Sequence, residues 1–217
     1  MTTEQSARPS TLTLENVREW ISSFHTLVTE QKVFLTELDS AIGDADHGIN
    51  LSRGMDAVAA KDGAPAATIG ELLKNVGMTL VSTVGGASGP LYGTFFLRFA
   101  ASAGEATALD GHAVATALTG SLDGVVARGK ATVGDKTMVD ALTPAVAAWV
   151  AAIGTGATVA DAATAARDAA RSGSDSTEPL VARRGRASYL GERSAGHLDP
   201  GSVSTSLLFA ALAQALT

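Results

Sequence analysis

The sequence lacks cysteine, so its 217 residues form no disulfide and no thiolate metal site. Acidic residues outnumber basic ones, 22 to 16, so no strongly basic surface exists to attract nucleic acid. No apolar run approaches the roughly 20 residues of a membrane-spanning helix, and residues 1–10 are polar, unlike a signal peptide. We therefore expect a cytoplasmic protein with a flexible segment at residues 1–10 and no nucleic-acid or membrane partner.

Aromatic residues make up only 5% of the chain and β-branched residues rarely alternate, so no convincing strand is predicted. Apolar residues recur instead at helical spacing, as at Val17, Ile21, Phe24 and Val28 after the capping residue Thr13. Similar stripes predict about eight helices, near residues 14–42 (with a break near 30), 50–60, 69–84, 90–103, 111–128, 138–153, 159–171 and 202–216. Residues 172–177 are expected to be mobile, and a short helix is expected before a long loop at 183–200. The pattern predicts an all-α fold in a single domain covering residues 1–217.

Three aspartates, Asp39, Asp44 and Asp46, lie within a segment of eight residues. Carboxylates this close repel one another unless a cation lies between them. Oxygen-only ligands favour hard cations such as magnesium or calcium over zinc. A solvated helix-capping loop is the alternative explanation, which the flanking glycines weaken. A calcium-binding EF-hand loop is excluded, because Met55 stands where a loop counted from Asp44 needs a carboxylate.

A glycine-rich turn at residues 85–90 brings bare backbone amides to a place where they could meet an anion, and Ser88 adds a hydroxyl. Alone, such a turn is weak evidence, since most glycine-rich turns only connect helices. Two better-known motifs are excluded. A Walker loop would need serine or threonine where Ala131 stands, and a nucleophile elbow would need glycine where Pro90 stands.

A third segment, residues 183–201, is a long loop, and long loops in compact domains tend to be functional. It concentrates Arg183, Arg184, Arg186 and Arg193 in an otherwise acidic chain. Arginine matches phosphate with a two-pronged fork of N–H donors, although a basic surface stretch explains the pattern equally well.

The four histidines fall into two groups. His47 and His197 lie in the glycine-bounded loops, where they could contact a nucleotide. His25 is expected to be structural and His112 exposed. None of the four is predicted to act as a nucleophile.

Taken together, these segments resemble the L subunit, or L domain, of dihydroxyacetone kinases. Residues 38–50 resemble the magnesium loop of that family, and residues 85–96 its second signature. Residues 128–130 with 134–138 resemble the third, and residues 185–201 the fourth. The four motifs stand in the family's order and cover nearly the whole chain. The alanine-rich segment near residue 160 is the least matched part.

The resemblance implies an antiparallel eight-helix barrel with a nucleotide bound at one end. It implies that Asp39, Asp44 and Asp46 hold two magnesium ions that bridge the phosphates of ADP or ATP. It also implies that the nucleotide is lined by His47, Gly48, Ile49, Asn50, Ala87, Ser88, Gly129, Met138, Arg186, Asp199, Pro200 and Gly201. No residue is required as acid, base or nucleophile, because positioning and electrostatics carry most of phosphoryl-transfer catalysis.

The family binds dihydroxyacetone in a separate K subunit or domain, which does not fit in this chain. A free-standing L chain resembles the form driven by the phosphoenolpyruvate phosphotransferase system, in which a phosphohistidine protein rephosphorylates bound ADP in place. One alternative is a subunit that exchanges free ATP and acts on dihydroxyacetone or a four-carbon ketose. Another is a nucleotide-loaded partner of a transcription regulator.

Overall fold

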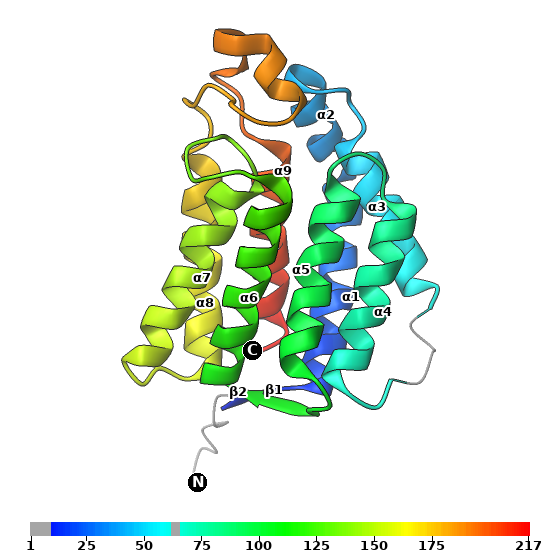
Figure 1. Cartoon of the computed structure of the whole chain (residues 1–217), viewed down its shortest axis with the longest axis vertical. Helices are drawn as coiled ribbons and strands as arrows, with labels where there is room; N and C mark the ends of the chain where they lie inside the picture. Colours follow the sequence, from blue (N-terminus) through cyan, green and yellow to red (C-terminus); the bar gives the residue numbers. More distant parts are fainter. Residues whose placement is uncertain (1–9, 62–65) are drawn as a thin grey trace, which may run out of the picture.

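The computed structural model describes residues 10–61 and 66–217 of the chain and is almost entirely helical (Figure 1). The expected flexible segment at residues 1–10 lies, apart from Ser10, outside the described residues. The elements are β1 (Thr11–Thr13), α1 (Leu14–Glu30), α2 (Lys32–Ile42), α3 (His47–Ala59), α4 (Ile69–Thr83), α5 (Ser88–Ala103), β2 (Ala108–Asp110), α6 (Gly111–Gly129), α7 (Met138–Gly154), α8 (Val159–Asp175), the 3₁₀ helix η1 (Arg186–Ser194) and α9 (Pro200–Gln214).

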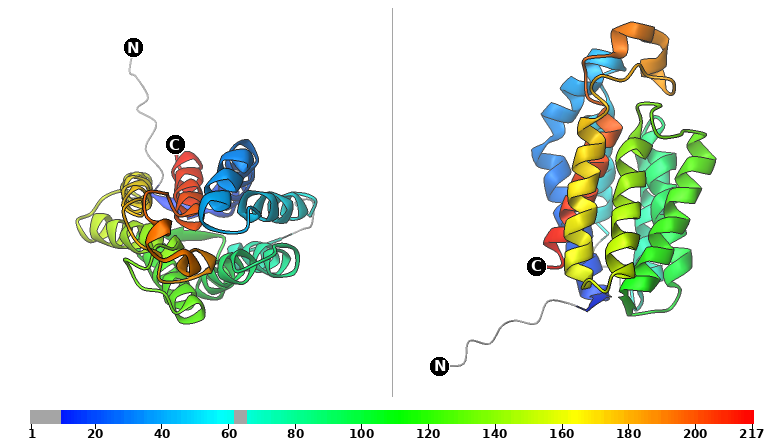
Figure 2. Two further views of the ribbon diagram at one scale, coloured as in Figure 1. Left: turned by 90° about the horizontal axis from the view of Figure 1, so that it is seen from above. Right: turned by 90° about the vertical axis from the view of Figure 1, so that its left-hand side faces the viewer.

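Eight of the described helices, α1 and α3 to α9, form a closed antiparallel ring. Each packs against the next along the chain, and α9 returns to α1 to close the ring, as the view from above shows (Figure 2). Helix α2 continues beyond α1 and packs against the first part of α3 and against η1. The predicted all-α, eight-helix barrel is confirmed. No helix among the described residues is long and apolar enough to cross a membrane.

Most of the scarce aromatic residues are buried inside the ring, although Phe34 and Tyr189 are exposed. Trp20 of α1 packs against Phe95, Phe96 and Phe99 of α5, with ring centroids 5.7 to 6.4 Å apart. The indole Nε1–H of Trp20 donates to the Leu208 carbonyl of α9 at 2.9 Å, so its one polar atom is satisfied in the core. Each such ring buries a large apolar area, which makes this cluster a main source of the barrel's stability.

The structure corrects several predicted helix boundaries and the prediction that the chain has no strand. Strands β1 and β2 pair antiparallel, with Leu12 opposite Leu109. At three residues each, they are too short to show an alternating pattern. Helix α5 begins at Ser88, two residues before Pro90, and α3 begins at His47 rather than Asn50. Both starts belong to glycine-bounded segments, where sequence gives no sharp signal.

The prediction of a mobile segment at residues 172–177 is wrong, because α8 continues to Asp175 and one face of its last turn is buried. Ser174 and Thr177 are almost fully buried, and both hydroxyls lie within hydrogen-bond distance of the Ser202 hydroxyl of α9. Polar residues that satisfy one another this way occupy a core although their sequence looks solvent-exposed. The short helix expected before residue 183 is also absent, and the long loop itself carries η1 instead.

Candidate nucleotide and metal site

A cavity of about 460 Å³ opens at the end of the barrel where η1 lies, the upper end in Figure 1. That volume is in the range of small-molecule and cofactor sites. Its walls come from all four predicted segments: the aspartate loop, the glycine-rich turn, the start of α7 and the arginine loop. Segments far apart in the sequence therefore meet at one site.

Four helices, α3, α5, α7 and α9, begin at this end because the barrel is antiparallel. Their first residues His47, Ser88, Met138 and Pro200 all line the cavity. A helix N-terminus carries unpaired amide N–H groups and a partial positive charge, so it favours anions. The fold thus presents four such ends to one cavity, which suits a ligand with several phosphates.

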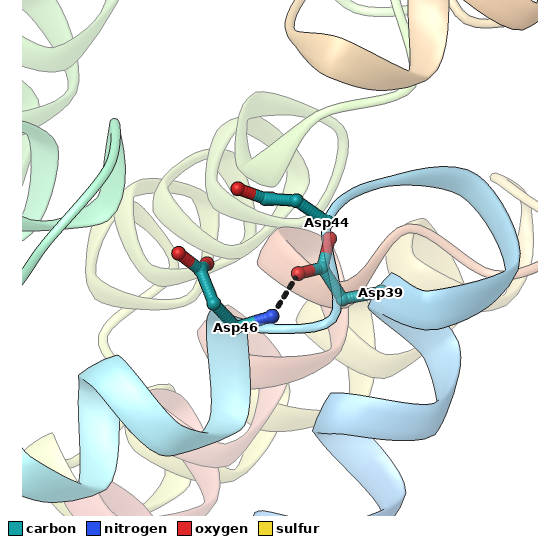
Figure 3. Close-up of side chains that lie close together, drawn as sticks. All are labelled: Asp39, Asp44 and Asp46. Carbon is teal, nitrogen blue, oxygen red and sulfur yellow. Dashed lines mark hydrogen bonds between the residues drawn. The ribbon is translucent and has the colours of Figure 1, made fainter.

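The three aspartates meet at the cavity wall (Figure 3). Asp39 at the end of α2, and Asp44 and Asp46 in the loop before α3, bring one carboxylate oxygen each within 4.8 Å of one another. Oδ2 of Asp39 accepts hydrogen bonds from the backbone N–H of Asp46 at 2.8 Å and of His47 at 3.0 Å. Ala45 adopts φ +61°, a left-handed conformation that turns the loop sharply between the other two aspartates.

Gly43 is needed where the aspartate loop begins. A Cβ atom at this position would lie 2.0 Å from Oδ1 of Asp39. Gly48 has a comparable role, since a Cβ there would lie 2.2 Å from the Lys32 carbonyl of α2. Gly48 thus lets α3 approach α2 closely, and Gly43 leaves room for the Asp39 carboxylate at the start of α3.

The charges in this cluster are suited to a hard cation. Burial, followed by the neighbouring Asp44 carboxylate, raises the pKa of Asp46 above its usual value. Nε of Arg186 lies 3.0 Å from Oδ2 of Asp44, but both side chains are substantially exposed, so this pair contributes little stability. An all-oxygen donor set with three negative charges fits Mg²⁺ and does not fit a soft metal.

The glycine-rich turn forms another part of the cavity wall. Gly86 adopts φ +65°, and a Cβ added to it would meet no atom within 4 Å, so the backbone faces open space. Gly89, in contrast, packs directly against the preceding backbone, because a Cβ there would lie 2.3 Å from the Val84 carbonyl. The turn therefore exposes backbone to the cavity at Gly86 while packing α5 tightly onto the end of α4.

A chain of side-chain hydrogen bonds runs behind this wall. Nδ1 of His47 lies 3.1 Å from the Ser88 hydroxyl, and its Nε2 lies 2.9 Å from the Ser204 hydroxyl. The Tyr92 hydroxyl lies 2.7 Å from that of Ser204. Burial lowers the pKa of His47 to about 4 and raises the pKa of Tyr92 to about 12, so both are neutral near pH 7. His47 contacts the cavity edge but is nearly buried.

Lys136 is a site residue that the sequence analysis missed. Its side chain is 1% exposed, and its ammonium donates to the carbonyls of Thr177, Glu178 and His197. Desolvation lowers its pKa, against the opposing effect of Asp199. This lysine attaches the loop before α7 to both ends of the arginine-rich segment. The backbone of Lys136 is left-handed, with φ +63°. Lysine rarely adopts this conformation, so the residue type did not indicate the turn.

Asp199 caps α9, because its Oδ2 accepts from the Ser202 N–H at 2.6 Å. Desolvation raises the pKa of Asp199 to about 7, with the backbone hydrogen bond from Ser202 opposing that shift. Asp199, Pro200 and Gly201 all line the cavity, as predicted.

Most of the predicted site residues therefore converge. Those that line the cavity are Asp39, Asp44, Asp46, His47, Ala87, Ser88, Gly129, Met138, Arg186, Asp199, Pro200 and Gly201. Gly48, Ile49 and Asn50 do not line it: Gly48 packs against α2, Ile49 is 45% exposed, and the Asn50 side chain accepts from Arg53 at 2.8 Å. His197, the other loop histidine, is exposed and also lies outside the lining.

A family model described as the DAK2 domain matches residues 41–214. The chain belongs to the DAK2 domain family. This confirms the family resemblance that the four motifs carried. The matched range includes the second and third aspartates of the cluster, the glycine-rich turn and the arginine loop.

Similar proteins of this family have known names. The chain is 43% identical over 205 residues to the "PEP-dependent dihydroxyacetone kinase, ADP-binding subunit DhaL" of Escherichia coli, covering 94% of this chain and 98% of that one. It is 34% identical to the "L-erythrulose 1-kinase" of Mycolicibacterium smegmatis, covering 93% of this chain but 36% of that one. Among solved structures, the native dihydroxyacetone kinase of C. freundii superposes with a TM-score of 0.72 at 25% identity, covering 99% of this chain and 37% of that one. These relatives are named as kinases or kinase subunits, and kinases are phosphotransferases.

Proposed function

We propose that this DAK2-family chain is the ADP-binding, phosphoryl-transferring subunit of a dihydroxyacetone kinase. The observation that carries the proposal is the extent of the match with the DhaL subunit, which covers 98% of that relative and 94% of this chain. The larger kinases are spanned only over about a third of their length, 36% and 37%. The match with the separate subunit thus extends over nearly its whole length, and we propose that residues 1–217 form one nucleotide-binding domain.

The nucleotide would occupy the cavity at the end of the barrel. Its phosphates would face the N-termini of α3, α5, α7 and α9, where the open backbone at Gly86 and the hydroxyl of Ser88 supply donors. Asp39, Asp44 and Asp46 would hold two magnesium ions, which neutralise phosphate charge and orient the group to be transferred. The three oxygens within 4.8 Å support this assignment of the ligands.

Arg186 would stabilise the transferring phosphoryl group. Its guanidinium already lies at the aspartate cluster, 3.0 Å from Asp44, on the segment that Lys136 attaches to the barrel. Catalysis would then consist of holding and orienting the phosphates in a site with fixed donors. We assign no side chain of this chain as acid, base or nucleophile.

The phosphoryl group would pass to dihydroxyacetone on a separate K subunit. The name of the E. coli relative includes dependence on PEP, which supports rephosphorylation of ADP by a phosphohistidine protein of the phosphoenolpyruvate phosphotransferase system. ADP would then stay bound through many cycles and act as a cofactor. We propose that the chain acts in the cytoplasm.

A single-turnover experiment tests this proposal. The chain is loaded with Mg-ADP, freed of excess nucleotide, and mixed with a phosphohistidine donor carrying ³²P. The proposal predicts labelled ATP that stays with the protein, followed by transfer of the label to dihydroxyacetone when a K subunit is added. Absence of labelled nucleotide with an active donor would refute the relay.

A second candidate is a kinase subunit that exchanges free ATP. The match to an L-erythrulose 1-kinase supports it, and that match extends the possible substrates to a four-carbon ketose. This candidate predicts sugar phosphorylation by the chain, a K subunit and free ATP without any phosphohistidine donor. A role beside a transcription regulator stays a prediction from the sequence, and we propose no partner for it.

A further inference from the structure

We propose that Tyr92 and Ser204 are positioning residues that act through His47 to turn the hydroxyl proton of Ser88 toward a phosphate in the cavity. The inference deepens the proposed function and rests on it. Tyr92 and His47 also line the cavity, whereas Ser204 does not. The effect proposed for Tyr92 and Ser204 is the one that reaches the ligand through His47 and the hydroxyl of Ser88.

The four side chains form one continuous line of hydrogen bonds from three helices. Ser88 and Tyr92 stand one turn apart on α5, His47 begins α3, and Ser204 lies on α9. The successive contacts are 3.1 Å from Ser88 to His47, 2.9 Å from His47 to Ser204, and 2.7 Å from Ser204 to Tyr92. Ser88 is the partly exposed end at the cavity, and the other three are buried.

The buried end fixes the direction in which the chain donates. The Tyr92 hydroxyl has contacts with only two groups among the described residues, the hydroxyls of Ser204 at 2.7 Å and Thr205 at 3.3 Å. Thr205 uses its proton for the Gly201 carbonyl at 2.8 Å. Tyr92 must therefore donate, and the shorter contact directs its proton to the oxygen of Ser204.

Ser204 then has one proton and two acceptors within reach. It can donate to the Gly201 carbonyl at 3.1 Å or to Nε2 of His47 at 2.9 Å. In the first case Nε2 carries the imidazole proton, Nδ1 accepts from Ser88, and the cavity meets only lone pairs of the serine. In the second case Nδ1 carries the proton and donates to Ser88, whose own proton is free to point into the cavity.

A phosphate in the cavity would select the second arrangement. An anion needs donors, and the nearby carboxylates already fill this end of the barrel with negative charge. In that arrangement every hydroxyl and ring nitrogen of these four side chains takes part in a hydrogen bond. All the donated protons then point along the line from Tyr92 toward the ligand. Hydrogen bonds aligned in one direction strengthen one another in a buried site.

Nitrogen NMR of the protein saturated with Mg-ADP tests the inference. The protein has four histidines, and His47 is the only one of them that is buried, so its ring signals can be assigned by substitution of the other three. The proposal predicts that His47 carries its proton on Nδ1. A proton on Nε2 in the ADP complex would overturn it while leaving the proposed function intact. Failure to bind Mg-ADP at all would contradict both.

Tyr92→Phe is the decisive variant, because it removes the donor at the buried end and keeps the ring. Ser204 would then accept from His47, so the imidazole proton should move to Nε2 and Mg-ADP affinity should fall roughly three- to tenfold. Thr205→Val is the matched control. It removes a neighbouring hydroxyl that is not part of the line of hydrogen bonds from Tyr92 to Ser88, so the His47 tautomer and the Mg-ADP affinity should stay unchanged. Loss of packing alone would not move the proton, so an Nδ1 proton in Tyr92→Phe would contradict the inference.

Discussion

Replacing Gly43 with alanine would displace Asp39, the first aspartate of the proposed metal site, without changing the charge of any residue. A Cβ at this position lies 2.0 Å from Oδ1 of Asp39, whereas ordinary contact begins at 3.4 Å. The carboxylate must therefore move by about 1.4 Å, the difference between these two distances. Such a shift breaks the bonds that Asp39 accepts from the amides of Asp46 and His47, at 2.8 and 3.0 Å.

The magnitude follows from those two hydrogen bonds. A hydrogen bond to a charged group contributes about 1.5 kcal/mol or more. Losing two therefore removes about 3 kcal/mol of the free energy that holds the Asp39 carboxylate in place. That corresponds to roughly a hundredfold loss in Mg-ADP affinity, because each 1.4 kcal/mol is a factor of ten. The barrel should stay folded, since the aromatic cluster lies far along the chain from this loop.

Calorimetric titration with ADP in excess magnesium measures the affinity, and circular dichroism with thermal unfolding measures the fold. Gly154→Ala is the matched control: this exposed glycine ends α7, and a Cβ there meets nothing within 4 Å. It should bind ADP normally and unfold no earlier than the parent, because alanine favours helix over glycine. A Gly43→Ala variant whose ADP affinity lies within about threefold of the parent's would refute this reasoning. Asp39 would then not be a metal ligand that the amides of Asp46 and His47 hold in place.

Three further changes test other parts of the site. Asp44→Ala should abolish tight, magnesium-dependent ADP binding with the helical spectrum unchanged, and normal ADP binding would remove Asp44 from the metal site. Arg186→Ala should weaken ADP binding by up to about 2 kcal/mol, measured by the same titration, and an unchanged affinity would remove Arg186 from the phosphate contacts. Asp199→Asn tests the raised pKa, about 7 against an ordinary 3.8. The folded carboxyl keeps a proton that the unfolded chain has lost, so its contribution to stability is present below about pH 4 and is lost as the pH rises to 7. Denaturation of the ligand-free asparagine variant should therefore show greater stability than the parent at pH 8 and a flatter pH profile, and parallel profiles would contradict the shift.

The sequence predicted the parts of the site that are local. Asp39, Asp44 and Asp46 are close in the chain, so their proximity in space follows from a single loop. The helix-start signal at Thr13 is local too, and Thr13 caps α1 as expected. The resemblance to the family then predicted that the glycine-rich turn and the arginine loop share one site with the aspartates. The spacing of these segments along the sequence could not have predicted this.

The residues that were missed depend on contacts between distant segments. Lys136 bonds carbonyls 41 to 61 positions away, and Tyr92 meets Ser204 at a separation of 112. Neither residue type signals such a role, since a lysine is usually exposed and a tyrosine at helical spacing usually belongs to a core. The motif places Ile49 and Asn50 beside the nucleotide, and that stays a prediction: neither lines the cavity, but Asn50 is buried next to Asp46 and Gly85, which do.

The most direct test of the central claim is the nucleotide that the purified protein carries. The chain is purified in magnesium without added nucleotide and denatured, and the released nucleotide is identified by chromatography. The account predicts close to one ADP per chain, because only a ligand with very slow dissociation survives purification. An empty protein that binds ATP weakly and reversibly would favour the ATP-exchanging kinase. A protein that binds neither nucleotide would contradict the account.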